Sequence, residues 1–84
     1  MQISYDSVYD VVVDVVASAA MTERANIRGD QDLIADLNLD SLALFEVVVD
    51  LEEAFRLQIA DETIEKLHTC SEITQFILRE LGDQ

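Results

Sequence analysis

A serine flanked by an acid stands where an irregular segment gives way to an apolar helix, in the run Asp40-Ser41-Leu42. A catalytic serine needs a base within hydrogen-bonding reach and usually an oxyanion hole. The only histidine, His68, lies far along the chain and is expected at the rim of the core, and Ser41 lacks the flanking glycines of a nucleophile elbow. Nearby acids also disfavour the alkoxide. The sequence therefore predicts a serine that is modified and carries a group, with no catalytic residue.

Oxygen ligands recur at Asp36, Asn38 and Asp40, which match the first, third and fifth positions of a calcium-binding loop. The sixth position holds Ser41 where that loop requires glycine, and the twelfth holds Val47 where it requires glutamate. We therefore expect no dedicated metal site. Loose binding of divalent ions by the clustered acids stays open.

The composition indicates one small domain over residues 1–84, because half of the residues are hydrophobic and a core can form without disulfides or metal. Eighteen acidic residues against five basic ones give a net charge of −13. This charge repels nucleic acids and anionic membranes and attracts basic protein surfaces. The single Cys70 cannot form an internal disulfide, and no secretory signal or membrane-spanning apolar run is present in the sequence. We expect a cytoplasmic monomer with no nucleic acid partner and no stable membrane insertion.

Residues 4–20 have the pattern of an amphipathic helix. Asp6, Asp10 and Asp14 recur every four residues, so a helix gathers them on one face, whereas a strand would place them beside the valines. Ser4 is the expected N-cap. The opposite, apolar face is expected to hold Tyr5, Val8, Tyr9, Val12, Val15, Val16 and Ala19.

Residues 21–40 lose this periodicity and are predicted to form a long loop. Apolar residues still punctuate it, and we expect Ile27, Leu33, Ile34 and Leu37 to anchor it to the core. Loops of this length in compact domains are usually functional or disordered, and regular anchors favour a functional loop. The loop delivers Ser41.

A second helix is predicted over residues 42–56. At about 100° per residue, its core stripe holds Leu44, Val47, Val48, Leu51, Ala54 and Phe55. The outer side mixes acidic and apolar residues, which a merely solvated face does not require. We expect this outer side to be a partner-binding surface with Phe45 as its anchor and a charged rim. It consists of Leu42, Phe45, Glu46, Val49, Asp50 and Glu53.

A short helix near residues 61–67, capped by Asp61, and a last helix, capped by Ser71 and ending at Gly82, complete the pattern. The last helix carries Ile73, Phe76, Ile77 and Leu81 at helical spacing. The predicted fold is therefore all-α, a small antiparallel bundle of three main helices and one short helix.

The run Asp36-Leu37-Asn38-Leu39-Asp40-Ser41-Leu42, followed by Leu51-Glu52-Glu53-Ala54-Phe55, closely resembles the acyl carrier protein family. The resemblance covers about residues 30–81 and implies a right-handed bundle. It implies that Ser41 receives 4′-phosphopantetheine from coenzyme A through a phosphopantetheinyl transferase. It implies that Asp40 helps present Ser41 and contributes to the metal-dependent encounter with that transferase. The arm's thiol would hold acyl groups as thioesters, so the protein would be a discrete, non-catalytic carrier that partner enzymes load and unload.

Several positions depart from the pattern of fatty-acid-synthesis members. Asn38-Leu39 stands where Gly-Ala is usual, Ala43-Leu44-Phe45 replaces Asp-Thr-Val, and Ala60 replaces a frequent proline. A leucine at position 39 in particular resembles the pattern of carriers in polyketide, aminoacyl or specialised lipid pathways. The function is expected in fatty acid, polyketide or specialised lipid biosynthesis. An aminoacyl or peptidyl carrier loaded by an adenylating enzyme and an unmodified acidic helical adaptor stay open as alternatives.

An acyl chain on such an arm could be sheltered in a groove between the helices. The expected lining residues are Val12, Val47, Leu51, Ile59, Leu67 and Ile77.

Overall fold

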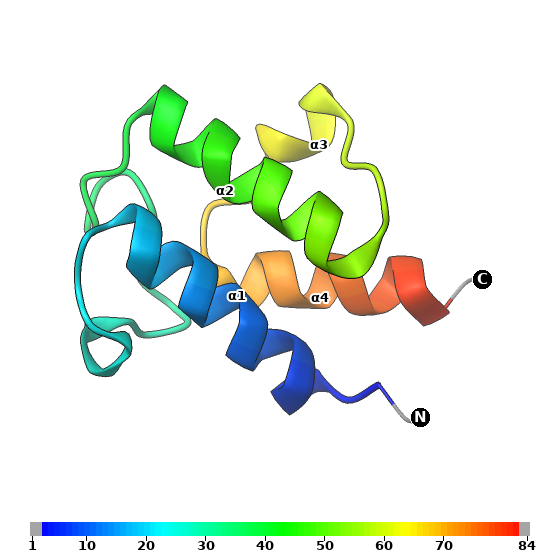
Figure 1. The fold of residues 1–84 in the computed structure, drawn as a ribbon. Coiled ribbons are helices and arrows are strands. Elements are labelled where there is room, and N and C mark those ends of the chain that lie inside the picture. The colour runs from blue at the N-terminus through cyan, green and yellow to red at the C-terminus, as the bar shows by residue number, and fades with distance from the viewer. Residues whose placement is uncertain (1–2, 83–84) are drawn as a thin grey trace.

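The computed structural model describes residues 3–82 as a helical bundle (Figure 1). Its body consists of α1 (Tyr5–Ala19), α2 (Ser41–Phe55) and α4 (Cys70–Gly82), and it also contains the short α3 (Asp61–Ile64) and one 3-10 turn, η1 (Arg24–Asn26). α1 packs against both α2 and α4 and runs opposite to them (Figure 1). The all-α fold with three main helices and one short helix is confirmed.

α1 begins as predicted, with Ser4 as its N-cap. The Ser4 hydroxyl accepts a hydrogen bond from the Ser7 backbone N–H at 3.2 Å, and the Ser7 side chain accepts one from the Ser4 N–H. This reciprocal pair satisfies donors that a helix start leaves free. The three aspartates of the polar face are exposed, as expected.

The buried face of α1 differs in part from the prediction. Val8, Val12 and Val16 are buried as expected, but Val13 and Ala17 are buried too, while Tyr5 is exposed. The reason is that α1 packs between two helices, so a wider face than one stripe is covered.

The long loop closes one side of the core through three buried side chains, Ile27, Leu33 and Leu39. Ile34 was expected to be an anchor, and this is wrong, because it is 55% exposed. The backbone conformation explains why Leu39 is buried in place of Ile34. Asn38 adopts a left-handed φ of 60°, which asparagine tolerates, and the Leu39 N–H donates to the Leu33 carbonyl at 3.0 Å. This turn directs Leu39 into the core.

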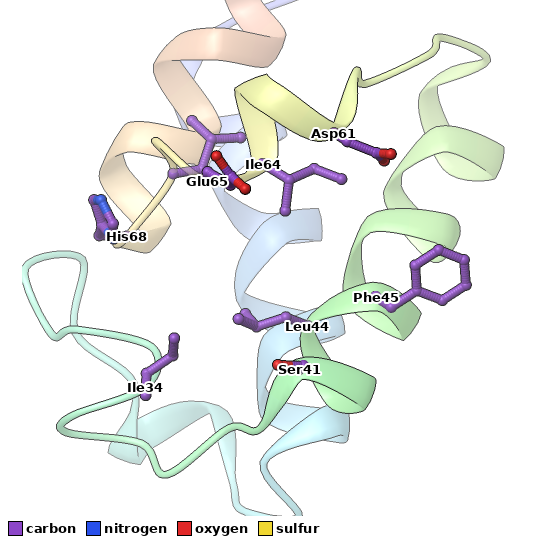
Figure 2. Close-up of a pocket in the computed structure, with 9 residues that line it drawn as sticks. Ile34, Ser41, Leu44, Phe45, Asp61, Ile64, Glu65 and His68 are labelled. Atoms are coloured by element: carbon purple, nitrogen blue, oxygen red, sulfur yellow. The ribbon is translucent and has the colours of Figure 1, made fainter.

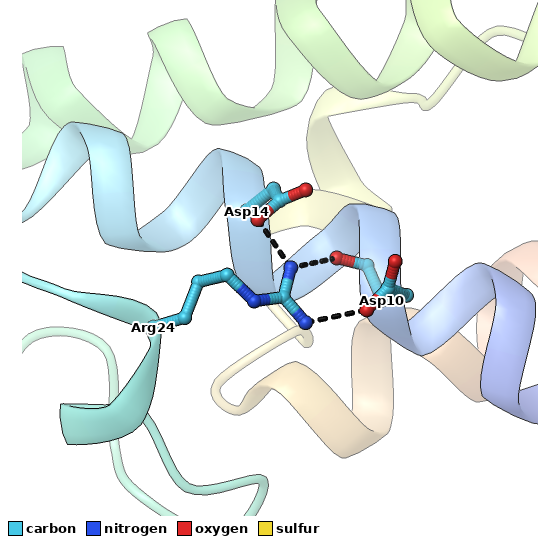
Figure 3. A network of polar contacts seen from close by, with 3 residues as sticks. All are labelled: Asp10, Asp14 and Arg24. Atoms are coloured by element: carbon cyan, nitrogen blue, oxygen red, sulfur yellow. Dashed lines mark hydrogen bonds and ion pairs between the residues drawn. The ribbon is translucent and has the colours of Figure 1, made fainter.

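Arg24 ties the first half of the loop to α1 (Figure 3). Its guanidinium bonds to the carboxylates of Asp10 and Asp14 and donates to the Asp10 carbonyl oxygen at 3.0 Å. The two aspartates are one turn apart on α1, so one planar guanidinium reaches both. The hydrogen bonds that Arg24 donates to Asp14 and Asp10 raise the pKa of Arg24. Because all three side chains are exposed, these ion pairs position the loop more than they stabilise the fold.

Two of the predicted helix caps are wrong. α3 is shorter than expected, and its N-cap is Ala60, without a side-chain hydrogen bond, so Asp61 is no cap. α4 begins at Cys70. The Thr69 hydroxyl accepts a hydrogen bond from the Glu72 N–H at 3.1 Å, and the Glu72 carboxylate accepts one from the His68 N–H at 2.9 Å. Threonine and glutamate three residues apart thus take the place expected for Ser71.

α2 buries most of its predicted stripe. Val47, Val48 and Leu51 are buried and Leu44 is half-buried, but Ala54 is exposed, contrary to expectation. The helix ends directly afterwards, at Arg56 in a left-handed conformation with φ of 55°. None of the helices within residues 3–82 combines the length and apolarity needed to cross a bilayer.

Candidate functional site

Ser41 is the first residue of α2, and its side chain is exposed. The helix cap is the preceding residue, because the Asp40 carboxylate accepts a hydrogen bond from the Ala43 N–H at 2.8 Å. The N-cap of α2 is therefore Asp40 and not Ser41, although serine is also a favoured cap residue. As a consequence, the Ser41 hydroxyl is not needed to begin the helix and is available for chemistry.

The loop that delivers Ser41 is held by its own carboxylates. The Asp32 carboxylate accepts from the N–H groups of Ile34 and Ala35, at 2.9 and 2.8 Å, and the Asp36 carboxylate accepts from the Asp32 N–H at 2.8 Å. The hydrogen bonds from Ala35 and Ile34 lower the pKa of Asp32. These carboxylates thus bind backbone N–H groups of the loop. Within residues 3–82, no cluster of three or more His, Cys, Asp or Glu side chains is placed to hold a metal ion.

A groove of about 420 Å³ opens beside Ser41, between α2 and the segment around α3 (Figure 2). Acidic and imidazole side chains stand at its rim, and Figure 2 shows His68 across the groove from Ser41. An exposed hydroxyl at the edge of a mainly apolar groove is suited to a covalently attached flexible group. The groove is lined by Ile34, Ser41, Leu44, Phe45, Asp61, Ile64, Glu65, Leu67 and His68.

Four of the six residues predicted to line an acyl groove between the helices, Val47, Leu51, Ile59 and Leu67, line a small cavity inside the bundle, and Leu67 also lines the groove beside Ser41. Val12 and Ile77 line neither space and are core residues. The residues missed are Ile34, Leu44 and Ile64. One signal could have found Leu44: it lies three residues after Ser41, on the same side of the helix.

The predicted partner-binding residues lie along the outer side of α2. Leu42 is 67% exposed and Phe45 57%, and the acidic Glu46, Asp50 and Glu53 are exposed as well. Val49 is half-buried. Figure 2 shows the Phe45 ring extending from α2 on the side away from Ile34. The structure thus brings two large apolar side chains and three acids onto one open face.

Comparison with known proteins connects this geometry to a family. Residues 10–77 match the family model described as the phosphopantetheine attachment site. The acyl carrier protein of Lactobacillus johnsonii is 31% identical over 72 residues, which cover 86% of this chain and 90% of that protein. The acyl carrier protein of Thermotoga maritima is 28% identical over 79 residues, covering 94% of this chain and 98% of that protein.

Solved structures give the same fold. The acyl carrier protein from Enterococcus faecalis superposes with a TM-score of 0.77 and 26% identity, over 92% of this chain and 98% of that one. The HMG-ACPI domain of the CurA module from Lyngbya majuscula gives a TM-score of 0.87 with 24% identity, over 99% of this chain and 83% of that one.

The chain belongs to the acyl carrier protein family, the phosphopantetheine-bearing carriers that the family model defines. The family inferred from Asp40-Ser41-Leu42 and its surroundings is confirmed. Proteins of this family hold acyl groups on covalently attached 4′-phosphopantetheine. Their partners are a phosphopantetheinyl transferase, which attaches the arm, and biosynthetic enzymes that load and use the cargo.

Proposed function

We propose that Ser41 carries the 4′-phosphopantetheine arm and that the chain acts as a discrete, non-catalytic carrier, a single domain over residues 1–84. The observation that carries the proposal is the division of roles at the start of α2. Asp40 caps the helix through the Ala43 N–H, which leaves the exposed Ser41 hydroxyl free to accept the arm. The groove that opens beside Ser41 gives the arm an apolar surface to rest on.

The N-terminus of α2 suits the phosphate of such an arm. The first turn of a helix leaves backbone N–H groups without partners, and the helix dipole favours negative charge there. Ser41 stands at the first position of this turn. The arm itself supplies a thiol that holds acyl groups as thioesters. The protein's own residues orient that arm, and Asp40 contributes its carboxylate to the encounter with the transferase.

The outer side of α2 is the proposed partner-binding surface, formed by Leu42, Phe45, Glu46, Val49, Asp50 and Glu53. Its acids steer basic enzyme surfaces toward Ser41 and raise the encounter rate, while Phe45 and Leu42 supply the apolar contact. The net charge of −13 favours a monomer and disfavours nucleic acid and membrane partners. We place the protein in the cytoplasm. The cargo is an acyl intermediate of fatty acid, polyketide or specialised lipid biosynthesis.

Intact mass after incubation with coenzyme A and a broad-specificity transferase tests the attachment site. We expect the wild-type chain to gain the mass of one phosphopantetheine and Ser41→Ala to gain none. Ser18→Ala is the matched control, because Ser18 is also an exposed helical serine, and it should gain the full mass. A gain that survives Ser41→Ala would place the arm elsewhere, and no gain in the wild type would favour an unmodified adaptor.

The loading enzyme identifies the cargo class. An acyltransferase that charges the arm of the modified protein supports the acyl assignment. Charging by an adenylating enzyme alone would make the chain an aminoacyl or peptidyl carrier.

A further inference from the structure

A separate pocket of about 370 Å³ lies between residues 63–67 and α4. It shares only Leu67 with the groove beside Ser41, and none of its lining residues belongs to the proposed partner-binding surface on α2. The function proposed for Ser41 makes no use of it. Its side chains differ in charge from the rest of the molecule.

Two of the five basic residues of the chain, Lys66 and Arg79, line this pocket. Both are exposed. Within residues 3–82 the ion pairs are those of Arg24 and Arg28, so neither Lys66 nor Arg79 is paired with a carboxylate there. In a chain with eighteen acidic residues, two unpaired cations on one pocket form a local positive site.

The acid that lines the pocket among the described residues is Glu72, and its carboxylate is engaged at the start of α4. It accepts hydrogen bonds from the His68 N–H at 2.9 Å and from the Thr69 hydroxyl at 3.5 Å. The positive end of the α4 dipole also stabilises this carboxylate. Glu72 therefore serves the helix cap and leaves Lys66 and Arg79 available to a ligand from outside.

Two apolar side chains line the same pocket. Leu67 and Phe76 pack against the core and keep part of their surface exposed. Aromatic side chains and arginine are enriched where proteins bind one another. A guanidinium such as that of Arg79 can bind a carboxylate through two parallel hydrogen bonds. The pocket thus combines apolar contact with recognition of carboxylates.

The charge of the surrounding molecule limits the kind of ligand. The other acids of the chain repel a wide acidic surface and a polyphosphate backbone. A second copy of the chain carries the same net charge of −13 and is repelled as well. A short acidic segment avoids most of this repulsion, because its carboxylates can lie on Lys66 and Arg79 while an apolar side chain contacts Phe76.

We propose that this pocket binds a short acidic segment of a partner protein, one that carries an apolar residue within a helical turn of two carboxylates. Because the pocket is separate from the α2 surface, the bound segment leaves that surface and Ser41 accessible. Such a second contact raises the effective concentration of the protein near its enzymes. This consequence rests on the proposed role of Ser41, whereas the binding itself does not.

The test uses the full, unmodified chain and a fluorescein-labelled peptide of about twelve residues, with leucines at helical spacing among Asp and Glu. The same peptide with Asn and Gln in place of Asp and Glu is the ligand control. Fluorescence anisotropy measures the affinity across a salt series, and backbone amide NMR shifts locate the site. We expect the acidic peptide to bind roughly tenfold more tightly than the neutral one, and less tightly as salt rises. It should shift the amides of Gln75, Phe76 and Arg79 and leave those of Leu42 and Phe45 unchanged.

Lys66→Gln and Arg79→Gln should each weaken binding several-fold. Arg28→Gln is the matched control, because it removes one positive charge from an exposed residue outside the pocket, and it should retain the wild-type affinity. Modification of Ser41 by the transferase should proceed at an unchanged rate with the acidic peptide bound.

Equal binding of the acidic and neutral peptides, or no binding of either at low salt, would overturn the proposal. An effect of Arg28→Gln as large as that of Arg79→Gln would also overturn it, as would shifts at Leu42 and Phe45 in place of those on α4. Shifts of the pocket amides that grow with the concentration of the chain alone would assign the pocket to a second copy instead. A chain that binds the peptide but gains no phosphopantetheine contradicts the role of Ser41 and leaves the pocket's ligand as proposed.

Discussion

The carboxylate of Asp40 accepts a hydrogen bond from the backbone N–H of Ala43 at 2.8 Å, so the cap of α2 lies one residue before Ser41. The helix start and the modification site are therefore carried by two adjacent side chains. Because the two roles are separate, substitution can remove one and retain the other.

Substitutions at Asp40 separate its cap from its charge. Asp40→Ala should lower the free energy of unfolding by about 1 kcal/mol, the typical cost of a lost N-cap, whereas Asp40→Asn keeps the cap and should be nearly neutral. Ser41→Ala should cost less than Asp40→Ala, since Ser41 does not cap the helix. Urea unfolding followed by circular dichroism measures all three. Equal losses for Asp40→Asn and Asp40→Ala would show that the charge, and not the cap, stabilises the helix start.

The single cysteine should not react with thiol reagents in the folded protein. Cys70 is fully buried, and burial raises the pKa of its thiol from 9.0 to about 11. The folded state thus favours the neutral thiol, so this group's contribution to stability is complete below pH 9 and is lost as the pH rises toward 11.

A disulfide reagent at pH 8 should therefore react rapidly with a single thiol, that of the arm, in the modified protein and with none in the unmodified one. Urea should expose Cys70 to the reagent, and Cys70→Ala should retain the fast reaction after modification. Rapid reaction of the unmodified, folded chain would show that Cys70 is accessible.

Stability should increase with salt. Thirteen net negative charges on 84 residues repel one another most in the compact state. Screening weakens that repulsion, and the exposed pairs of Arg24 with Asp10 and Asp14 have little stabilisation to lose. We expect the melting temperature to rise by a few degrees with monovalent salt, and to rise with millimolar Mg²⁺ or Ca²⁺. A melting temperature that falls with salt would mean that ion pairs hold the fold together.

Phe45 and Glu46 should affect transferase docking in different ways. Phe45→Ala should weaken docking at any ionic strength, because it removes an apolar contact, while Glu46→Lys should slow modification mainly at low salt, because it disturbs steering. Steady-state modification rates across a salt series measure both effects.

The matched control is Phe76→Ala, on the half-buried side of α4. It should lower the melting temperature clearly and leave docking by the folded protein unchanged. If Phe45→Ala instead costs the roughly 3–5 kcal/mol typical of a buried aromatic, the residue belongs to the core and not to a docking surface.

The periodic parts of the sequence predicted the bundle well. Spacing of Asp6, Asp10 and Asp14 set the polar face of α1, because the helical period alone fixes angular position. The helical period does not predict which neighbouring elements cover each turn of a helix. For that reason the period predicts a core position for Ala54, at the end of α2, although this residue is exposed, and it does not predict the burial of Val13 between helices.

Loop positions and caps were harder to predict, because hydrogen bonds between distant backbone groups decide them. Leu39 rather than Ile34 enters the core through the turn at Asn38. Aspartate and serine are both favoured at the N-cap, so residue type alone does not predict whether Asp40 or Ser41 caps α2. The cap of α4 was readable, since Thr69 and Glu72 have the spacing of a capping box.

Tandem mass spectrometry of the protein purified from its native cell tests the central claim most directly, because it detects the arm, its position and its cargo together. We expect one 4′-phosphopantetheine on the peptide that contains Ser41, with an acyl group bound as a thioester that hydroxylamine releases. Native protein without the arm, or with the arm on any other residue, would contradict it.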